Sequence, residues 1–198
     1  MFNLTYKKII KIGYLICLVA GFLLHFAYDF FNNNLIIGLL TPVNESVSEH
    51  LKLIFLPFTL FTIFFYFYSK KKLTNIFIVS FFANILGTAA TTISFYIGIN
   101  FLGMNNTVFN ISTYVIGMTV AFITFYFGIY NNNFQDATKS SNELGICALL
   151  LLTTLFITNT LLPLKLPINK DPVTKTYGIF KAKWNTETFC FCVFWLFC

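Results

Sequence analysis

The chain has 198 residues, of which 57% are hydrophobic, 20% aromatic and 10% charged. Soluble globular domains carry about 25% charged residues, so this composition argues against a soluble protein and indicates a membrane protein. The formal net charge is +6, but it does not indicate nucleic-acid binding. The chain has no arginine, and its lysines cluster at the ends of apolar segments. We therefore expect a lipid bilayer, and no nucleic acid, as the partner.

Five apolar segments are long enough to cross the roughly 30 Å hydrocarbon core of a bilayer, which takes about 20 helical residues. They predict an all-α fold, a polytopic transmembrane helical bundle. The expected spans are residues 9–31, 51–68, 73 to about 99, 109–130 and 144–162. A cleaved signal peptide is the alternative for the first segment, but its apolar run exceeds the usual h-region, which favours a retained anchor. Pro57 predicts a kink in the second span.

Lysine clusters predict the orientation of the bundle. Cytoplasmic ends of spans are enriched in lysine and arginine. One cluster precedes the first span and another follows the second, so both predict a cytoplasmic N-terminus; their members are Lys7, Lys8, Lys11, Lys70, Lys71 and Lys72. Residues 32–50 and 100–108 are then outside, and residues 131–143 inside. With five spans the lysine-bearing C-terminal tail is also outside, which disagrees with the rule.

A polar stretch interrupts the apolar sequence between the first two spans. Thr41 followed by Pro42 is typical of a helix start, because threonine can cap free N–H groups and proline at the first helical position loses no hydrogen bond. A helix from about Pro42 would place Glu45, Glu49 and Lys52 on one face. The rest of the polar patch consists of Asn44, Ser46, Ser48 and His50.

Two interpretations of this patch are open. In the first, Glu45 complements the positive end of the helix, Glu49 pairs with Lys52, and the patch faces water. In the second, the patch packs against His25 and Asp29, which share one helical face at the end of the first span. Ionisable groups at membrane depth are costly and usually face a bundle interior or a wet cavity.

The second interpretation predicts that Glu45, Glu49 or His50 approaches His25. A His–carboxylate pair could orient a base, and two histidines with two glutamates could hold a divalent metal. The candidate metal ligands are His25, Glu45, Glu49 and His50. Asp171 can reach the same side of the membrane. The whole candidate cluster is His25, Asp29, Asn44, Glu45, Ser46, Glu49, His50, Lys52 and Asp171.

Polar and sulfur-containing residues elsewhere give weaker signals. Cys17 and Cys147 lie in spans, where they serve as small apolar packing residues. Cys190, Cys192 and Cys198 have no paired metal-binding spacing, and a disulfide or metal role for them is the alternative. Asn84, Thr88, Thr91, Ser94, Thr154, Thr158 and Asn159 are expected to form hydrogen bonds between helices, with a substrate path as the alternative.

Three motifs resemble a family of small multi-pass bacterial membrane proteins of unknown function. They read HFAYD from His25, PVNESVSEHLK from Pro42 and DPVTKTYG from Asp171. The resemblance covers residues 9 to about 179 and implies no activity. Lys175 stands where the family pattern has glycine, which puts the turn after Asp171 in doubt. We expect one transmembrane domain over residues 1–179 and a divergent tail over residues 180–198.

The sequence therefore predicts an integral membrane protein whose outward polar cluster binds a ligand or stabilises the fold. The alternative is a membrane-embedded, metal-dependent hydrolase acting on lipid or peptide, with His25 and His50 as ligands or bases. Two histidines are too few for three-His enzymes, and the missing arginine excludes the paired-Glu-then-Arg pattern. The lack of arginine with abundant Asn, Lys, Ile and Phe favours an AT-rich bacterial genome and a bacterial cytoplasmic membrane.

Overall fold

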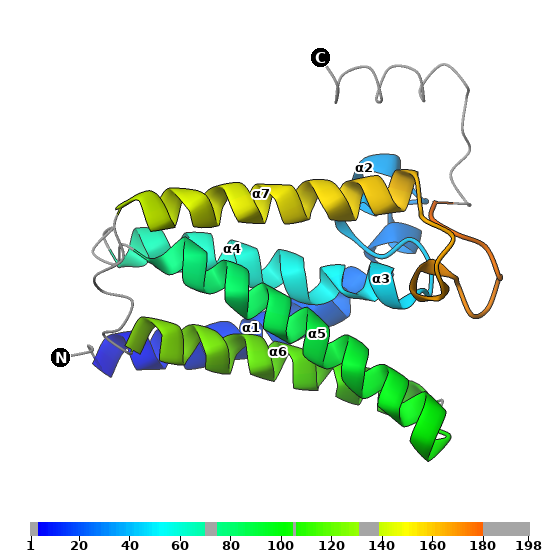
Figure 1. The fold of residues 1–198 in the computed structure, drawn as a ribbon, viewed down its shortest axis with the longest axis horizontal. Coiled ribbons are helices and arrows are strands. Elements are labelled where there is room, and N and C mark those ends of the chain that lie inside the picture. The colour runs from blue at the N-terminus through cyan, green and yellow to red at the C-terminus, as the bar shows by residue number, and fades with distance from the viewer. Residues whose placement is uncertain (1–3, 70–74, 105, 131–138, 180–198) are drawn as a thin grey trace, which may run out of the picture.

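The computed structural model describes residues 4–69, 75–104, 106–130 and 139–179. These residues form seven α-helices and one short 3-10 helix (Figure 1). The helices are α1 (Leu4–Phe30), α2 (Leu35–Leu40), α3 (Val47–His50), α4 (Lys52–Tyr68), α5 (Ile76–Leu102), α6 (Thr107–Tyr130) and α7 (Lys139–Leu161), and the 3-10 helix is Pro167–Asn169. The predicted all-α fold is confirmed.

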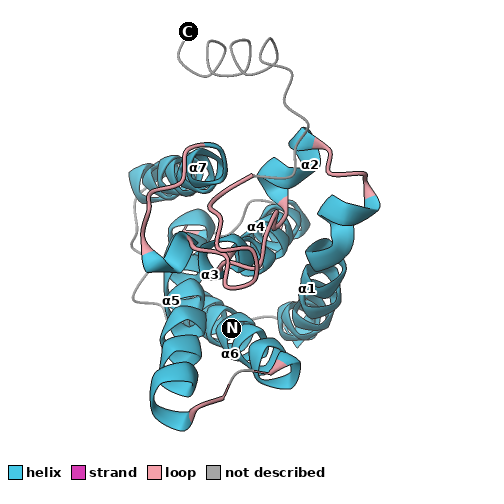
Figure 2. Ribbon diagram, turned by 90° about the vertical axis from the view of Figure 1, so that its right-hand side faces the viewer, coloured by secondary structure: helices cyan, strands magenta, loops and turns pink. Residues whose placement is uncertain are grey.

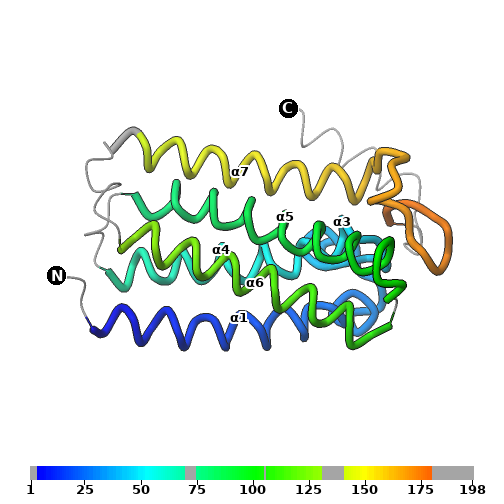
Figure 3. Tube along the Cα trace, turned by 60° about the horizontal axis from the view of Figure 1, so that its bottom comes forward, coloured from blue at the N-terminus to red at the C-terminus, as the bar shows by residue number. Residues whose placement is uncertain are grey.

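Among the described residues, five helices are long and apolar enough to cross a membrane, which agrees with the predicted number of spans. They are Leu4–Phe30, Val47–Tyr68, Ile76–Leu102, Thr107–Tyr130 and Ser141–Leu161, so the second span combines α3 with α4. The long helices run alongside one another in an up-and-down bundle (Figure 3). Their bounds differ from the predicted ones by a few residues, because polar residues continue several helices beyond their apolar runs.

Helix α4 lies near the centre of the bundle, with the other long helices around it (Figure 2). Half of its span is buried inside the protein, against 17% for α7. Its buried face carries Phe58, Phe61 and Phe65, which pack edge-on or tilted against Phe122 and Phe125 of α6. The aromatic content of the sequence thus fills the core between α4 and α6.

Pro57 lies inside α4 and affects how that helix meets α1. Proline has no N–H, so the carbonyl of Leu53 loses its helical hydrogen bond. A Cβ added to Gly21 of α1 would lie 2.7 Å from that carbonyl oxygen. Only glycine allows this approach, and it brings the backbone of α1 against the freed carbonyl.

The short elements gather at one end of the bundle. Helices α2 and α3, the loop between them and the segment after α7 all lie at the same end of the bundle (Figure 1). The opposite end carries the start of α1, with Lys7, Lys8 and Lys11. Lys70, Lys71 and Lys72, the loop 131–138 and the cysteines after residue 180 lie outside the described residues.

The prediction of a helix from about Pro42 is wrong. Thr41 instead ends α2, where its hydroxyl donates to the Ile37 carbonyl at 2.8 Å, and α3 begins only at Val47. Asn44 Oδ1 accepts from the Ser46 N–H at 2.9 Å, and this local bond competes with a helical start. Glu45 therefore lies in a loop and not on a helical face with Glu49.

Polar side chains within the spans donate hydrogen bonds mostly to backbone carbonyls of their own helices. Thr88, Ser94 and Thr154 donate to carbonyls three or four residues earlier. Bonds between helices join Asn84 to Thr59, Thr91 to the Thr113 carbonyl, and Asn159 to Ser48. Cys17 is buried and its thiol faces the Pro57 carbonyl, whereas Cys147 is exposed.

Candidate metal site and its supporting network

Three segments that are far apart in sequence meet at the end of the bundle that carries the short helices. They are the end of α1, the α2–α4 region and the segment after α7. Asn44 Nδ2 donates to the Gly178 carbonyl at 2.9 Å, and the Ile179 N–H donates to the Thr160 carbonyl at 3.1 Å. Tyr28, Val43 and Ile179 form a small apolar cluster beneath these contacts. The three motif segments of the sequence therefore build one local structure.

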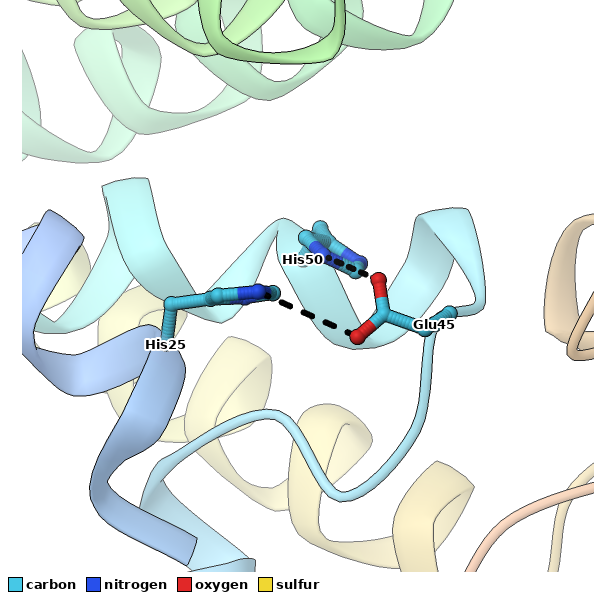
Figure 4. A group of neighbouring side chains, drawn as sticks. All are labelled: His25, Glu45 and His50. Carbon is cyan, nitrogen blue, oxygen red and sulfur yellow. Dashed lines mark ion pairs between the residues drawn. The ribbon is translucent and has the colours of Figure 1, made fainter. Parts of the chain in front are cut away.

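His25, Glu45 and His50 form the outer part of this structure (Figure 4). His25 Nε2 lies 3.8 Å from Glu45 Oε1, and His50 Nε2 lies 3.4 Å from Glu45 Oε2. The two imidazole rings are 5.0 Å apart between centroids. The candidate ligand atoms of the three residues all lie within 4.8 Å of one another, a grouping that can hold a metal ion.

The backbone orients His50. Its Nδ1 lies 2.8 Å from the Ser46 carbonyl oxygen, which can only accept, so Nδ1 carries a proton and donates. In the neutral ring, Nε2 is then the nitrogen with the free lone pair. That lone pair faces a carboxylate oxygen of Glu45, an arrangement that requires either a proton or a cation between the two atoms.

The charge of Glu45 is stabilised by the same neighbours. Its interaction with the His50 side chain lowers the pKa of Glu45, and the charges of His50 and His25 act in the same direction. Partial burial and the nearby Asp171 carboxylate oppose this shift. The Glu45 side chain is 52% exposed, so the carboxylate stays ionised at neutral pH and open to solvent. It is available as a metal ligand.

Glu49 and Lys52 form a second, inner cluster. Their side chains are 2% and 3% exposed, and Lys52 Nζ lies 2.7 Å from Glu49 Oε2. The predicted pair exists, but the expectation that it faces water is wrong. Lys52 also donates to Thr160 Oγ1 and to the carbonyls of Gly38 and Thr41.

The remaining acceptor positions of Glu49 are also filled. Its Oε2 accepts from the Val43 N–H at 3.2 Å, and its Oε1 accepts from the Thr160 hydroxyl at 2.8 Å. These bonds tie α3 and α4 to α7 and to the loop that carries Glu45. A buried ion pair is tolerated when further hydrogen bonds satisfy both charges, as here. Both carboxylate oxygens of Glu49 are therefore occupied within this network, and Glu49 is not a candidate metal ligand.

Asp171 organises the segment after α7. Its carboxylate accepts from the N–H groups of Val173 and Thr174 and from the Thr174 hydroxyl. These bonds, with one from the Glu45 backbone, lower the pKa of Asp171 although its burial acts to raise it. Lys175 has a φ of +60°, a left-handed conformation that glycine favours. The turn therefore has the backbone shape that a glycine would give it.

A small cavity of about 150 Å³ adjoins the outer cluster. Its polar lining comes from all three segments and includes His25, Asp29, Asn44, Glu45 and Asp171. Asp29 is exposed and faces this cavity, while Ser46 is buried and holds Asn44 and His50 through its backbone. The cavity has room for a few waters or a small polar group beside the three candidate ligands.

Sequence reasoning missed Thr160, which bonds both members of the inner pair. Its local sequence, TNT at the end of an apolar span, carries no signal of this role. Only the packing of α7 against the α2–α4 region brings its hydroxyl to Glu49 and Lys52.

A family model, the family of unknown function DUF6512, matches residues 2–179. The chain belongs to this family. The match spans all three segments that build the outer and inner clusters. Comparison with characterised proteins and with solved structures found no match.

Proposed function

We propose that this DUF6512 member is an integral membrane protein that binds a divalent transition-metal ion through His25, His50 and Glu45. The observation that carries the proposal is the convergence of these three ligand atoms within 4.8 Å. Two imidazoles and a carboxylate are a common ligand set for zinc.

The distances support a tetrahedral ion. Zinc lies about 2.0–2.2 Å from nitrogen and oxygen ligands, which sets ligand atoms about 3.4 Å apart. The 3.4 Å between His50 Nε2 and Glu45 Oε2 matches this separation. His25 Nε2 lies 3.8 Å from the other carboxylate oxygen, Oε1, and one ligand atom from each residue fits within 4.8 Å, so the side chains must draw closer around an ion. The bond from His50 Nδ1 to the Ser46 carbonyl is the outer-shell contact that orients a histidine ligand.

The lysines support one orientation of the site in the membrane. Lys7, Lys8 and Lys11 lie at the opposite end of the bundle, and lysine-rich ends of spans face the cytoplasm. We propose that the metal site faces the exterior of a bacterial cytoplasmic membrane. A reporter fused after Lys72 should then give a cytoplasmic signal, and one fused after Asn105 an external signal. The reverse pattern would contradict the orientation.

The metal proposal is tested on full-length protein purified through a tag without histidine. After incubation with Zn²⁺ and gel filtration, metal analysis should give close to one ion per chain. The variants His25→Ala, His50→Ala and Glu45→Gln should each weaken binding at least tenfold, because each removes one of three ligands. Glu143→Gln, at the opposite end of the molecule, is the matched control. Unchanged binding in all three ligand variants would overturn the proposal.

A second candidate function is hydrolysis by the same metal. Three protein ligands leave one position of a tetrahedral ion open, as in catalytic zinc sites, and Asp29 lines the adjoining cavity. Asp29→Asn should then abolish hydrolysis of a phospholipid or peptide substrate while metal content stays unchanged. A metal-loaded protein without turnover on either substrate class would leave the binding function alone.

A further inference from the structure

We propose a second ligand site at the opposite end of the bundle, which binds one anionic phospholipid in a groove between α1 and α6. The groove has a volume of about 600 Å³, within the range of ligand pockets in proteins. This inference is independent of the metal site, with which the groove shares no lining residue.

The groove changes from charged to apolar along its length. On α1, Lys7, Lys8 and Lys11 line the end nearest the N-terminus, and Tyr14 lines the other end. On α6, which runs in the opposite direction, the lining continues with Phe122, Ile123, Tyr126 and Phe127. The Tyr14 hydroxyl lies 2.8 Å from Thr119 Oγ1 and bridges the two helices at the deep end.

The lysines at the mouth have no acidic partner within the part of the chain that the structure describes. Among the described residues, no ion pair joins Lys7, Lys8 or Lys11 to a carboxylate. Helix α6 contains no charged residue, and the one acid of α1, Asp29, lies at the far end of that helix. Lys7 lies over the Tyr130 ring, with 5.3 Å from Nζ to the centroid. A cluster of three lysines above an apolar groove is complementary to a phosphate above an acyl chain.

The position of the groove in the bilayer selects a lipid as the occupant. Both helices are candidate spans, so the apolar part of the groove faces acyl chains and its lysine end lies at headgroup level. Tyr126 and Tyr130 are stacked at that end, and tyrosine is enriched at membrane interfaces. Each lysine near an anionic headgroup strengthens binding by about 1 kcal/mol, or roughly fivefold. A phosphodiester headgroup with net negative charge therefore fits better than a zwitterionic one.

Native mass spectrometry of the full-length protein in detergent tests the proposal, with phosphatidylglycerol and phosphatidylcholine of equal acyl chains as probes. Phosphatidylglycerol should bind at least tenfold more tightly. The double variant Lys8→Gln/Lys11→Gln should lose about tenfold or more of that affinity, whereas Lys165→Gln/Lys170→Gln should not. Ile123→Trp, which fills the groove and keeps every lysine, should also weaken binding.

Several outcomes would overturn this site. Equal binding of the two lipids would show that headgroup charge is not recognised, and full affinity in the Lys8/Lys11 variant would exclude these lysines. Full affinity in Ile123→Trp would exclude the groove. Displacement by millimolar inorganic phosphate would identify a soluble anion as the ligand. Thermal unfolding of each variant shows whether it is folded, so that a folded variant with unchanged binding contradicts the proposal.

Discussion

Two members of the outer cluster, Glu45 and His50, come from the same short stretch of sequence as the inner pair, Glu49 and Lys52. The two clusters nevertheless differ in burial and in hydrogen bonding. The outer cluster, His25, Glu45 and His50, is partly exposed, and the buried His25 Nδ1 has no hydrogen-bond partner among the described residues. In the inner cluster, Glu49 and Lys52 are almost fully buried and their charges meet several hydrogen-bond partners. Satisfied polar groups stabilise a fold, whereas polar groups with free coordination capacity beside a cavity are available to a ligand.

The two glutamates give the strongest test of this difference. Glu49→Gln removes the countercharge of a buried lysine, and breaking a buried ion pair costs roughly 3–5 kcal/mol. We expect a large fall in the thermal unfolding temperature in detergent. The double variant Glu49→Gln/Lys52→Met, which removes both charges, should recover part of the loss. Glu49→Gln with wild-type stability would show that the inner pair does not hold the fold.

Glu45→Gln is the counterpart at the outer cluster. Its carboxylate is half exposed, and exposed ion pairs contribute about 0–1 kcal/mol, so stability should change little. Metal binding should fall instead. Glu49→Gln should therefore lower stability, whereas Glu45→Gln should lower metal content at nearly unchanged stability. Equal destabilisation by both would make the outer cluster a structural one.

Thr160 offers a smaller test of the inner network. Thr160→Val keeps the shape of the side chain and leaves Glu49 Oε1 without its hydrogen bond, which should cost about 2 kcal/mol. Thr154→Val is the matched control in the same helix, because Thr154 is exposed and its hydroxyl donates to the Leu150 carbonyl of its own helix. The difference between the two unfolding temperatures measures the network. Equal unfolding temperatures of the two variants would show that the bond from Thr160 to Glu49 does not stabilise the fold.

The sequence predicted the spans well because bilayer thickness dictates their length and composition, whatever the tertiary contacts. It also predicted that His25 lies near Glu45 or His50, because ionisable side chains at one end of a membrane bundle are costly in contact with lipid and gather together. It failed at Pro42, where the hydrogen bond between Asn44 and Ser46 prevented the expected helix. Thr160 could not be found, because its role depends on how α7 packs. The orientation and the metal remain predictions.

Asp171 makes the stability of the folded protein depend on pH. Its pKa is lowered from the ordinary value of 3.8, so the ionised form stabilises the folded state. That contribution is complete above the ordinary value and is lost as pH falls through the lower folded value. Asp171→Asn should therefore cost about 1 kcal/mol near neutral pH, and its stability should fall less than that of wild type below pH ~4. Parallel acid profiles for the two proteins would contradict this role.

The smallest expected effect concerns Lys175, whose backbone has the left-handed conformation that glycine favours. A left-handed residue with a side chain costs roughly 1–2 kcal/mol relative to glycine, and glycine gives part of this back through the entropy of the unfolded chain. Lys175→Gly should therefore stabilise the protein by about 0.5–1 kcal/mol, although it loses the exposed bond from Lys175 Nζ to the Pro172 carbonyl. Lys170→Gly is the matched control, because Lys170 has an extended backbone with a φ of −81°; there glycine brings only the entropic cost, and stability should fall. The two changes remove the same side chain from the same segment, so unfolding temperatures that move in opposite directions isolate the backbone conformation. If both variants lose stability, the turn after Asp171 does not require a left-handed residue at position 175.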